Sequence, residues 1–72
     1  MKLKLGEIYY SEEWNILAKA IYSQQETSII LQVIKIVGTM TLWSIDEKLC
    51  NCELCLNKFR PLNKLEKLNL IF

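Results

Sequence analysis

Three cysteines, Cys50, Cys52 and Cys55, lie within six residues and form the one cluster in the sequence with the composition of a chemical site. Thiolates bind zinc, and structural zinc sites place four Cys or His ligands at the corners of a tetrahedron. The chain contains no His and no fourth Cys. A zinc site would therefore need a ligand from elsewhere, and a zinc ion shared between two copies of the chain is the remaining metal hypothesis.

The backbone around the cysteines decides whether their sulfurs meet. On a continuous helix, at about 100° per residue, Cys52 and Cys55 point within about 60° of each other, whereas Cys50 points to the opposite side. The three can meet at one ion only if the helix breaks. A helix predicts instead that Cys52 is a small core residue, Cys55 an edge residue and Cys50 an exposed thiol. A redox pair at Cys52 and Cys55 lacks the βαβ setting that supports it, so we expect no bound metal and no cofactor.

A helix is what the pattern around the cysteines predicts. Ser44–Glu47 has the S-x-x-E form of a capping box. Pro61 disfavours helical geometry in the residue before it, so the helix should span 45–59. The chain after Pro61 either opens a new turn or forms a strand that closes the sheet. The expected helical stripe is Ile45, Leu49, Cys52, Leu56 and Phe59, and the apolar side of the tail is Leu62, Leu65 and Leu68.

The stretch Thr27–Val37, TSIILQVIKIV, is a near-continuous apolar run interrupted only by Gln32 and Lys35. Such β-branched runs are typical of strands buried on both faces. Something must therefore cover each face, and the 45–59 helix is one candidate cover. Alternation places Ile29, Leu31, Val33 and Val37 on one face and Ile30, Ile34 and Ile36 on the other.

The segments on either side of this run predict further strands. Lys2–Tyr10 alternates, with Gly6 as a bulge or bend. Trp14–Tyr22 fits either a helix capped by Ser11 or a strand, and the pattern alone does not decide. Ser23–Glu26 is short enough for a hairpin connection. Gly38–Thr39 predicts a turn into another strand over residues 40–44, which would bring Trp43 close to the β-branched run.

Length and composition predict one domain over residues 1–72. The content of 51% hydrophobic and 24% charged residues excludes a disordered tail. A net charge of +1 is too balanced to indicate nucleic-acid binding by itself. The start of the chain lacks the apolar core of a signal peptide, and the longest apolar run is about half of what a bilayer requires. We expect a cytoplasmic protein with no membrane partner, and the odd number of cysteines fits a reducing compartment.

Catalytic constellations are missing from the sequence. Without His, the usual acid–base partner of a nucleophile is absent, and two glycines do not make a phosphate-binding loop. We therefore predict that the chain is not an enzyme. Aromatic and basic side chains remain as candidate binding residues, through stacking and phosphate contacts or through a protein interface. They are Tyr9, Trp14, Lys58, Arg60, Lys64 and Lys67.

The order of these signals resembles small phage and bacterial modules with an SH3-like barrel, over residues 3–62. The likeness lies in LGEIYY at Leu5–Tyr10, Trp14, Gly38, WSIDE at Trp43–Glu47 and FRPL at Phe59–Leu62. In that pattern a brief helical turn joins the last two motifs, whereas here Lys48–Asn57 is longer and carries the cysteines. The resemblance implies a binding module without catalysis, often phage-encoded, and it carries over no functional residues. It favours a strand for Trp14–Tyr22.

We therefore predict an α+β fold, a small curled antiparallel sheet or SH3-like barrel of about four strands with one amphipathic helix at 45–59. The leading hypothesis is a non-enzymatic protein-interaction module, a phage-encoded inhibitor of a host protein such as a defence nuclease, in the manner of anti-CRISPR proteins. One alternative is a nucleic-acid-binding module that uses the sheet aromatics and the basic residues of the C-terminal segment. Another is a zinc-stabilised homodimer, and a homodimer could also form through an exposed sheet edge.

Overall fold

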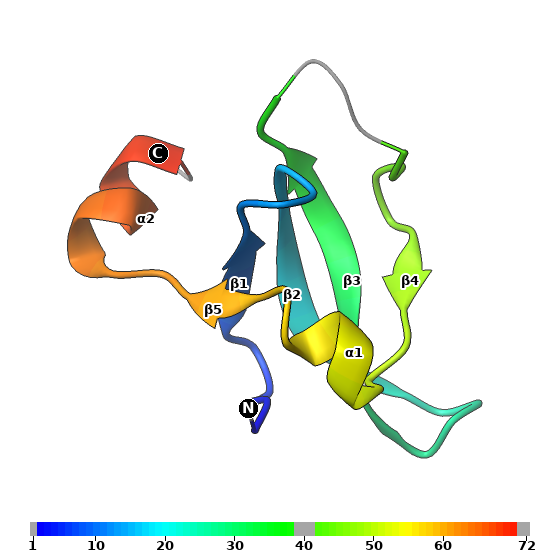
Figure 1. Cartoon of the computed structure of the whole chain (residues 1–72). Coiled ribbons are helices and arrows are strands. Elements are labelled where there is room, and N and C mark those ends of the chain that lie inside the picture. The colour runs from blue at the N-terminus through cyan, green and yellow to red at the C-terminus, as the bar shows by residue number, and fades with distance from the viewer. Residues whose placement is uncertain (1, 39–41, 71–72) are drawn as a thin grey trace.

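The computed structural model describes residues 2–38 and 42–70, which form an antiparallel sheet with two short helices (Figure 1). The strands pair in the order β4-β3-β2-β1-β5, and every neighbouring pair is antiparallel. Strands β4 and β5 end the sheet at opposite edges, so the barrel is not closed. The elements are β1 (Ile8–Ser11), β2 (Ile16–Ser23), β3 (Ser28–Ile36), β4 (Lys48–Leu49), α1 (Glu53–Leu56), β5 (Arg60–Pro61) and α2 (Lys64–Leu70).

The apolar run predicted as the central strand is confirmed as β3. It pairs with β2 along its length and with β4 at Leu31 and Gln32. Leu31 and Val33 are fully buried on one face, and Ile30 is almost fully buried on the other. Both faces are therefore covered at the centre of the strand, as its composition requires. The main core cluster is Tyr9, Ile16, Ala18, Ala20, Leu31, Val33, Leu49 and Phe59.

A β-bulge in β3 changes which residues share a face. Leu17 pairs with Lys35 and Ala18 pairs with Val33, so Ile34 is the extra residue. The bulge reverses the alternation beyond it, and Ile36 packs against the core cluster. The prediction that Ile36 lies on the same face as Ile34 is therefore wrong.

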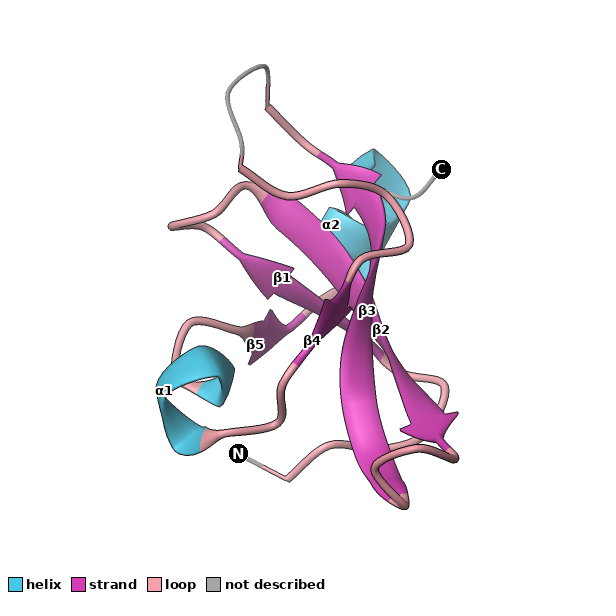
Figure 2. Cartoon of the chain, turned by 90° about the vertical axis from the view of Figure 1, so that its right-hand side faces the viewer, coloured by secondary structure: helices cyan, strands magenta, loops and turns pink. Residues whose placement is uncertain are grey.

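The reverse face of the sheet contacts the end of α2. Leu17 is fully buried but lies outside the main cluster, and its partner Lys35 extends from the same face. The Lys35 ammonium donates a hydrogen bond to the carbonyl oxygen of Leu70. The last turn of α2 therefore lies on this reverse face, far from α1 (Figures 1 and 2).

The first two strands form a hairpin, so the strand reading of Trp14–Tyr22 holds from Ile16 onward. Ser11 does what a helix N-cap would do, because its Oγ accepts a hydrogen bond from the Trp14 N–H at 3.2 Å. A turn follows in place of a helix, with Asn15 in the left-handed region at φ 54°. The bend predicted at Gly6 is confirmed at φ 87°, and β1 begins only after it.

The predicted helix at 45–59 is wrong. Lys48–Leu49 pairs with β3 as an edge strand, and α1 is a single turn. Strand pairing replaces the helix because β3 offers an unpaired edge and Leu49 can be buried there. The Ser44–Glu47 signature closes a turn: the Glu47 carboxylate accepts the Ser44 N–H at 3.1 Å, and Asp46 adopts φ 71°.

The remaining predictions concern the two chain segments beside the sheet. Part of the expected strand at 40–44 lies outside the described residues, and Leu42–Ser44 form no strand. Both alternatives for the tail occur in succession, since β5 pairs with β1 and α2 follows. Among the described residues, no helix has the length and apolar character needed to cross a bilayer.

Candidate functional site

The three cysteines lie where the chain leaves the sheet between β4 and α1. Cys50 directly follows β4, Cys52 is the N-cap residue of α1, and Cys55 lies within α1. The Asn51 side-chain amide holds this segment to the start of β3 by donating to the carbonyl oxygen of Ile29 at 3.3 Å. The end of β4 and the single turn of α1 therefore determine where the thiols point.

The three sulfur atoms converge. The Cys50 Sγ lies 2.9 Å from the Cys52 Sγ and 3.1 Å from the Cys55 Sγ, and all three lie within 4.8 Å of one another. The predictions that Cys50 points away from the others and that Cys52 is a core residue are wrong. The chain bends between β4 and α1, and both of these thiols are exposed, as was predicted for Cys50 alone.

The close sulfurs change each other's acidity. The neighbouring Cys50 side chain, followed by the backbone N–H of Cys55, stabilises the Cys52 thiolate and lowers the pKa of Cys52 to about 7. Hydrogen bonds to Cys50 and Cys52 hold the proton on Cys55 and raise the pKa of Cys55 to about 12. Cys52 is therefore the more readily ionised of the two thiols near neutral pH, and the thiolate is the form that acts as nucleophile and metal ligand.

The cluster is a potential metal site built from sulfur alone. Within residues 2–38 and 42–70, no Asp or Glu joins the three thiols as a further potential ligand. The chain also contains no His. The protein therefore offers three of the four ligands of a tetrahedral zinc site.

The chain matches no protein-family model, no curated protein and no solved structure. The SH3-like resemblance therefore stays a prediction. Function has to be inferred from the chemistry of the side chains themselves.

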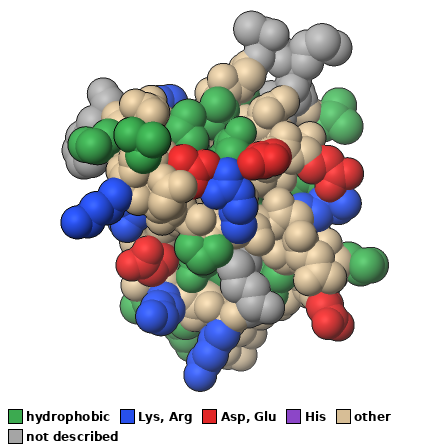
Figure 3. Space-filling view, turned by 60° about the vertical axis from the view of Figure 1, so that its left-hand side comes forward, with side chains coloured by type: hydrophobic (Ala, Val, Ile, Leu, Met, Phe, Trp, Pro, Cys, Tyr) green, Lys and Arg blue, Asp and Glu red, His purple; other side chains and the backbone are tan. Residues whose placement is uncertain are grey.

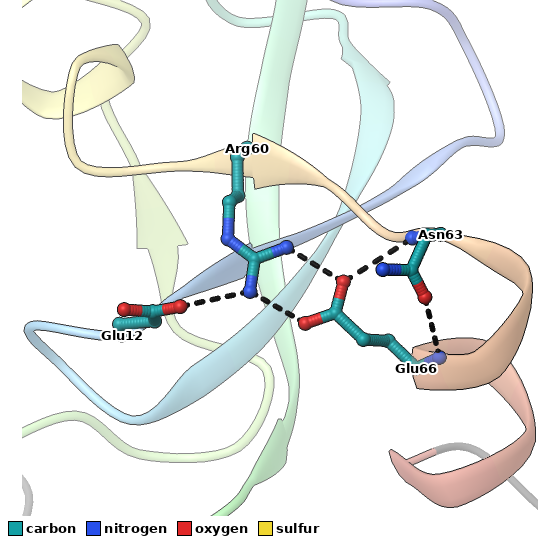
Figure 4. A network of polar contacts seen from close by, with 4 residues as sticks. All are labelled: Glu12, Arg60, Asn63 and Glu66. Carbon is teal, nitrogen blue, oxygen red and sulfur yellow. Dashed lines mark hydrogen bonds and ion pairs between the residues drawn. The ribbon is translucent and has the colours of Figure 1, made fainter.

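A second exposed cluster surrounds Arg60 in β5 (Figure 4). Its guanidinium donates to both carboxylate oxygens of Glu66 in α2, at 2.6 Å to Oε1, and to Glu12 in the β1–β2 turn at 2.8 Å. It also lies 5.2 Å from the centre of the Tyr10 ring. One side chain thus ties β5 and the start of α2 to the β1–β2 turn, 48 residues away along the chain.

Charge pairing sets the acidity within this cluster. The hydrogen bonds from Arg60, followed by that from the Asn63 N–H, lower the pKa of Glu66 to about 2. Glu66 in turn raises the pKa of Arg60, with a smaller contribution from Glu12. The Glu66 N–H donates back to Asn63 Oδ1 at 2.8 Å. Asn63 and Glu66 therefore form a reciprocal capping box at the start of α2.

Lys58 and Trp14 form a neighbouring contact. The Lys58 ammonium pairs with Glu13 and lies 5.7 Å from the centre of the Trp14 ring. Trp14 itself packs against Trp43 and Phe59, with ring centres 5.0 and 5.8 Å apart. Trp14 is therefore half-buried against other rings, which leaves less of its face open for stacking.

The structure does not gather the six predicted binding residues on one surface. Tyr9 is only 3% exposed, and its hydroxyl accepts the Lys4 N–H at 2.9 Å. Lys64 is exposed and Lys67 half-buried on α2, apart from Tyr9 in the core. Because Lys58 and Arg60 are paired with glutamates, this surface is mixed in charge rather than basic, and nucleic-acid binding through it stays a prediction.

Sequence reasoning missed the acidic partners Glu12, Glu13 and Glu66. The N-x-x-E spacing of Asn63 and Glu66 was the available signal for the start of α2. No local signal links Glu12 to Arg60, because 48 residues separate them. A depression of about 250 Å³ lies among these charges, lined by Tyr10, Glu12, Glu13, Asn57, Lys58, Phe59 and Arg60.

Proposed function

We propose that the chain is a small, non-enzymatic protein-interaction module that contacts its partner through the outward face of α2. The observation that carries this proposal is the orientation of the helix. Leu65 and Leu68, three residues apart and thus on one face, are 66% and 61% exposed. Glu66 and Lys67, between these leucines, are half-buried, and Glu66 pairs with Arg60. An amphipathic helix normally buries its apolar face, so this orientation leaves an apolar surface for another molecule.

Polar contacts hold the helix in this orientation. Arg60 fixes Glu66, Asn63 caps the first turn, and Lys35 binds the carbonyl of Leu70 at the end. The exposed leucines are not needed for these contacts. A partner could therefore cover Leu65 and Leu68 without displacing α2 from the sheet.

The side of the molecule that carries α2 has the features of a protein-binding surface, with an apolar centre and charged residues at its edge. Figure 3 shows hydrophobic side chains on this side, close to a row in which a basic group lies between acidic groups. Such a surface suits a partner with an apolar groove, since a helix laid into a groove uses anchors spaced three or four residues apart. The paired charges of Arg60, Glu12 and Glu66 would lie at the edge of that contact.

A host protein is the partner class that we propose, and a defence nuclease is the first example to test. This choice rests on the resemblance to small phage modules, and the leucine pair adds an apolar contact surface. A direct assay would measure cleavage by a purified defence nuclease with and without the chain. Unchanged cleavage together with no binding would reject that nuclease as the partner.

Site-specific photo-crosslinking tests the contact surface. A photoreactive residue at position 65 or 68 should crosslink to one host protein in cells that make the chain. The same residue at position 54 is the control, because Leu54 is 79% exposed but lies on α1. Equal adducts from positions 54 and 65, or adducts between copies of the chain only, would contradict the proposal.

Affinity measurements with the captured protein give the second test. We expect Leu65→Asp and Leu68→Asp each to weaken binding at least about 10-fold, because burying one leucine contributes about 1.5–3 kcal/mol. Leu54→Asp should leave the affinity unchanged. Circular dichroism should show the same fold for all three variants, since all three leucines are exposed.

A further inference from the structure

We propose that Cys50, Cys52 and Cys55 bind one zinc ion through three thiolates and leave its fourth coordination position open to solvent. The convergence of all three sulfurs within 4.8 Å carries this inference. It is independent of the leucine face of α2, because α1 and α2 lie far apart (Figure 1).

The sulfur positions fit a tetrahedral ion after small movements. Zinc–sulfur bonds of about 2.3 Å place the ligand sulfurs of a tetrahedral site about 3.8 Å apart. The distances from the Cys50 Sγ are 2.9 Å to Cys52 and 3.1 Å to Cys55, and the whole group lies within 4.8 Å. Small side-chain rotations that displace each sulfur by less than about 1 Å would accommodate the ion.

Hydrogen bonds of the surrounding segment position the cysteines. Asn51 ties the segment between Cys50 and Cys52 to the carbonyl of Ile29. The Cys52 carbonyl accepts the N–H of Leu56 at 3.0 Å, and the Cys55 carbonyl accepts the N–H of Lys58 at 3.1 Å. These bonds form the turn of α1 and the bend after it. The ion would therefore enter a site whose ligands are already assembled.

The chemistry of the cluster also suits a cation, which three converging thiolates would bind. Three groups that ionise to anions face one another, and within the described part of the chain no Lys or Arg hydrogen bonds to their sulfurs. Soft thiolate ligands select zinc over hard cations such as magnesium and calcium. Binding releases the thiol protons: Zn²⁺ and three thiols give a zinc tris-thiolate and three H⁺, with water at the fourth position.

The exposure of the site explains the open position. Cys50 and Cys52 are exposed and Cys55 is partly so. A structural zinc site normally has four protein ligands, whereas a site with three leaves room for an external ligand. We therefore infer a stoichiometry of one zinc per chain, with the chain remaining a monomer.

Cobalt(II) is the spectroscopic probe for the test. Adding Co²⁺ to the full-length, fully reduced chain should produce a thiolate-to-cobalt charge-transfer band and strong d–d bands of a four-coordinate ion. Both should saturate at one equivalent, and Zn²⁺ should abolish them by displacement. We expect Cys50→Ser, Cys52→Ser and Cys55→Ser each to lower the metal affinity at least about 100-fold. This loss exceeds what is typical when a residue that only hydrogen bonds to a metal ligand is replaced.

The matched control is Glu53→Gln, which removes the carboxylate next to Cys52 and leaves the thiols intact. Its metal affinity should equal that of the unchanged chain. Zinc should also raise the melting temperature of the reduced chain by about 10 °C or more at a concentration 100-fold above its dissociation constant. Light scattering should report a monomer before and after zinc addition.

Several results would overturn the proposal. Absence of the charge-transfer band in the reduced chain would reject the site. Retention of full affinity in Cys50→Ser would show that only two thiols bind, and loss of affinity in Glu53→Gln would show a carboxylate ligand. One zinc per two chains would replace the open position with a shared site. An unchanged melting temperature at saturating zinc would contradict a site assembled in the folded chain.

Discussion

The cluster around Arg60 and the cluster of cysteines differ in the charges that their members carry. In the cluster around Arg60, one cation bonds to two carboxylates, and the partners of each charge are in the protein. In the cluster of Cys50, Cys52 and Cys55, three groups of the same kind converge without a cation among the described residues. The first cluster pairs opposite charges within the protein, whereas the second brings together three potential ligands of one cation.

The comparison separates structural from functional clusters on physical grounds. The planar guanidinium of Arg60 matches carboxylate geometry, and this pairing fixes the orientation of α2. Because both side chains are partly exposed, 42% for Arg60 and 21% for Glu66, we expect the main effect of the pair to be orientation rather than stability. The convergent thiols hydrogen bond to one another but pair no opposite charges, and holding an ion is the role that we propose for them.

Truncating Phe59, which separates the cysteine segment from Arg60 in the sequence, should have the largest effect on the free energy of unfolding. Phe59 is buried, and it precedes Arg60 while following the cysteine segment. We expect Phe59→Ala to lower the free energy of unfolding by about 3–5 kcal/mol, because it leaves a cavity in the main core cluster. Urea denaturation measures this loss, and both metal binding and the Arg60 pairing should weaken.

Leu54→Ala is the control for Phe59→Ala, because Leu54 is mostly exposed on α1. It should change the free energy of unfolding by less than about 0.5 kcal/mol. Equal losses in the two variants would mean that Phe59 does not anchor the segment between β4 and β5.

A smaller change should affect the Arg60 cluster alone. Asn63→Ala removes the side chain that accepts the Glu66 N–H, and loss of such a cap costs about 1 kcal/mol. Far-ultraviolet circular dichroism and urea denaturation should show a less stable α2 with unchanged cobalt binding. Asn69→Ala, near the other end of α2, is the matched control. A loss of cobalt affinity in Asn63→Ala would show that the two clusters are coupled.

The smallest expected effect is on the pH dependence of the free energy of unfolding. Arg60, followed by Asn63, lowers the pKa of Glu66 from 4.5 to about 2 in the folded chain. The stabilisation is therefore fully present above pH 4.5, where the unfolded chain is also ionised, and it is lost as the pH falls towards 2. Glu66→Gln should flatten the decline of stability in this window, whereas Glu26→Gln should leave it unchanged. Identical pH profiles for Glu66→Gln and the unchanged chain would contradict this pairing.

The capping signatures show what the sequence could and could not predict. Ser11 accepts the bond that its spacing indicates, and Glu47 accepts the Ser44 N–H, but the Glu47 N–H bonds to the Ser44 carbonyl instead of its side chain, and both sites close turns. Only Asn63 and Glu66 use the same chemistry to start a helix. A side chain that hydrogen bonds to the backbone three residues away can close a tight turn as well as start a helix. The signature therefore predicts the hydrogen bond but not whether a turn or a helix contains it.

Strand pairing between distant segments explains the other places where the structure differs from the fold expected from the sequence. The apolar run of β3 was predictable because its composition alone requires burial on both faces. The strand at Lys48–Leu49 was not, since it depends on the free edge of β3 at Gln32. That pairing ends the helical reading of 45–59, and with it the expectation that Cys50 points away. The sequence therefore indicated three cysteines that could bind metal, but it did not predict that their sulfurs converge.

The most direct test of the convergence is nuclear magnetic resonance of the three cysteine ¹³Cβ atoms during zinc titration of the reduced chain. Cβ shifts report whether each thiol binds metal. We predict that the signals of Cys50, Cys52 and Cys55 move together and stop moving at one equivalent of zinc. A Cys50 signal that stays in place while the other two move would contradict the convergence of the three sulfurs.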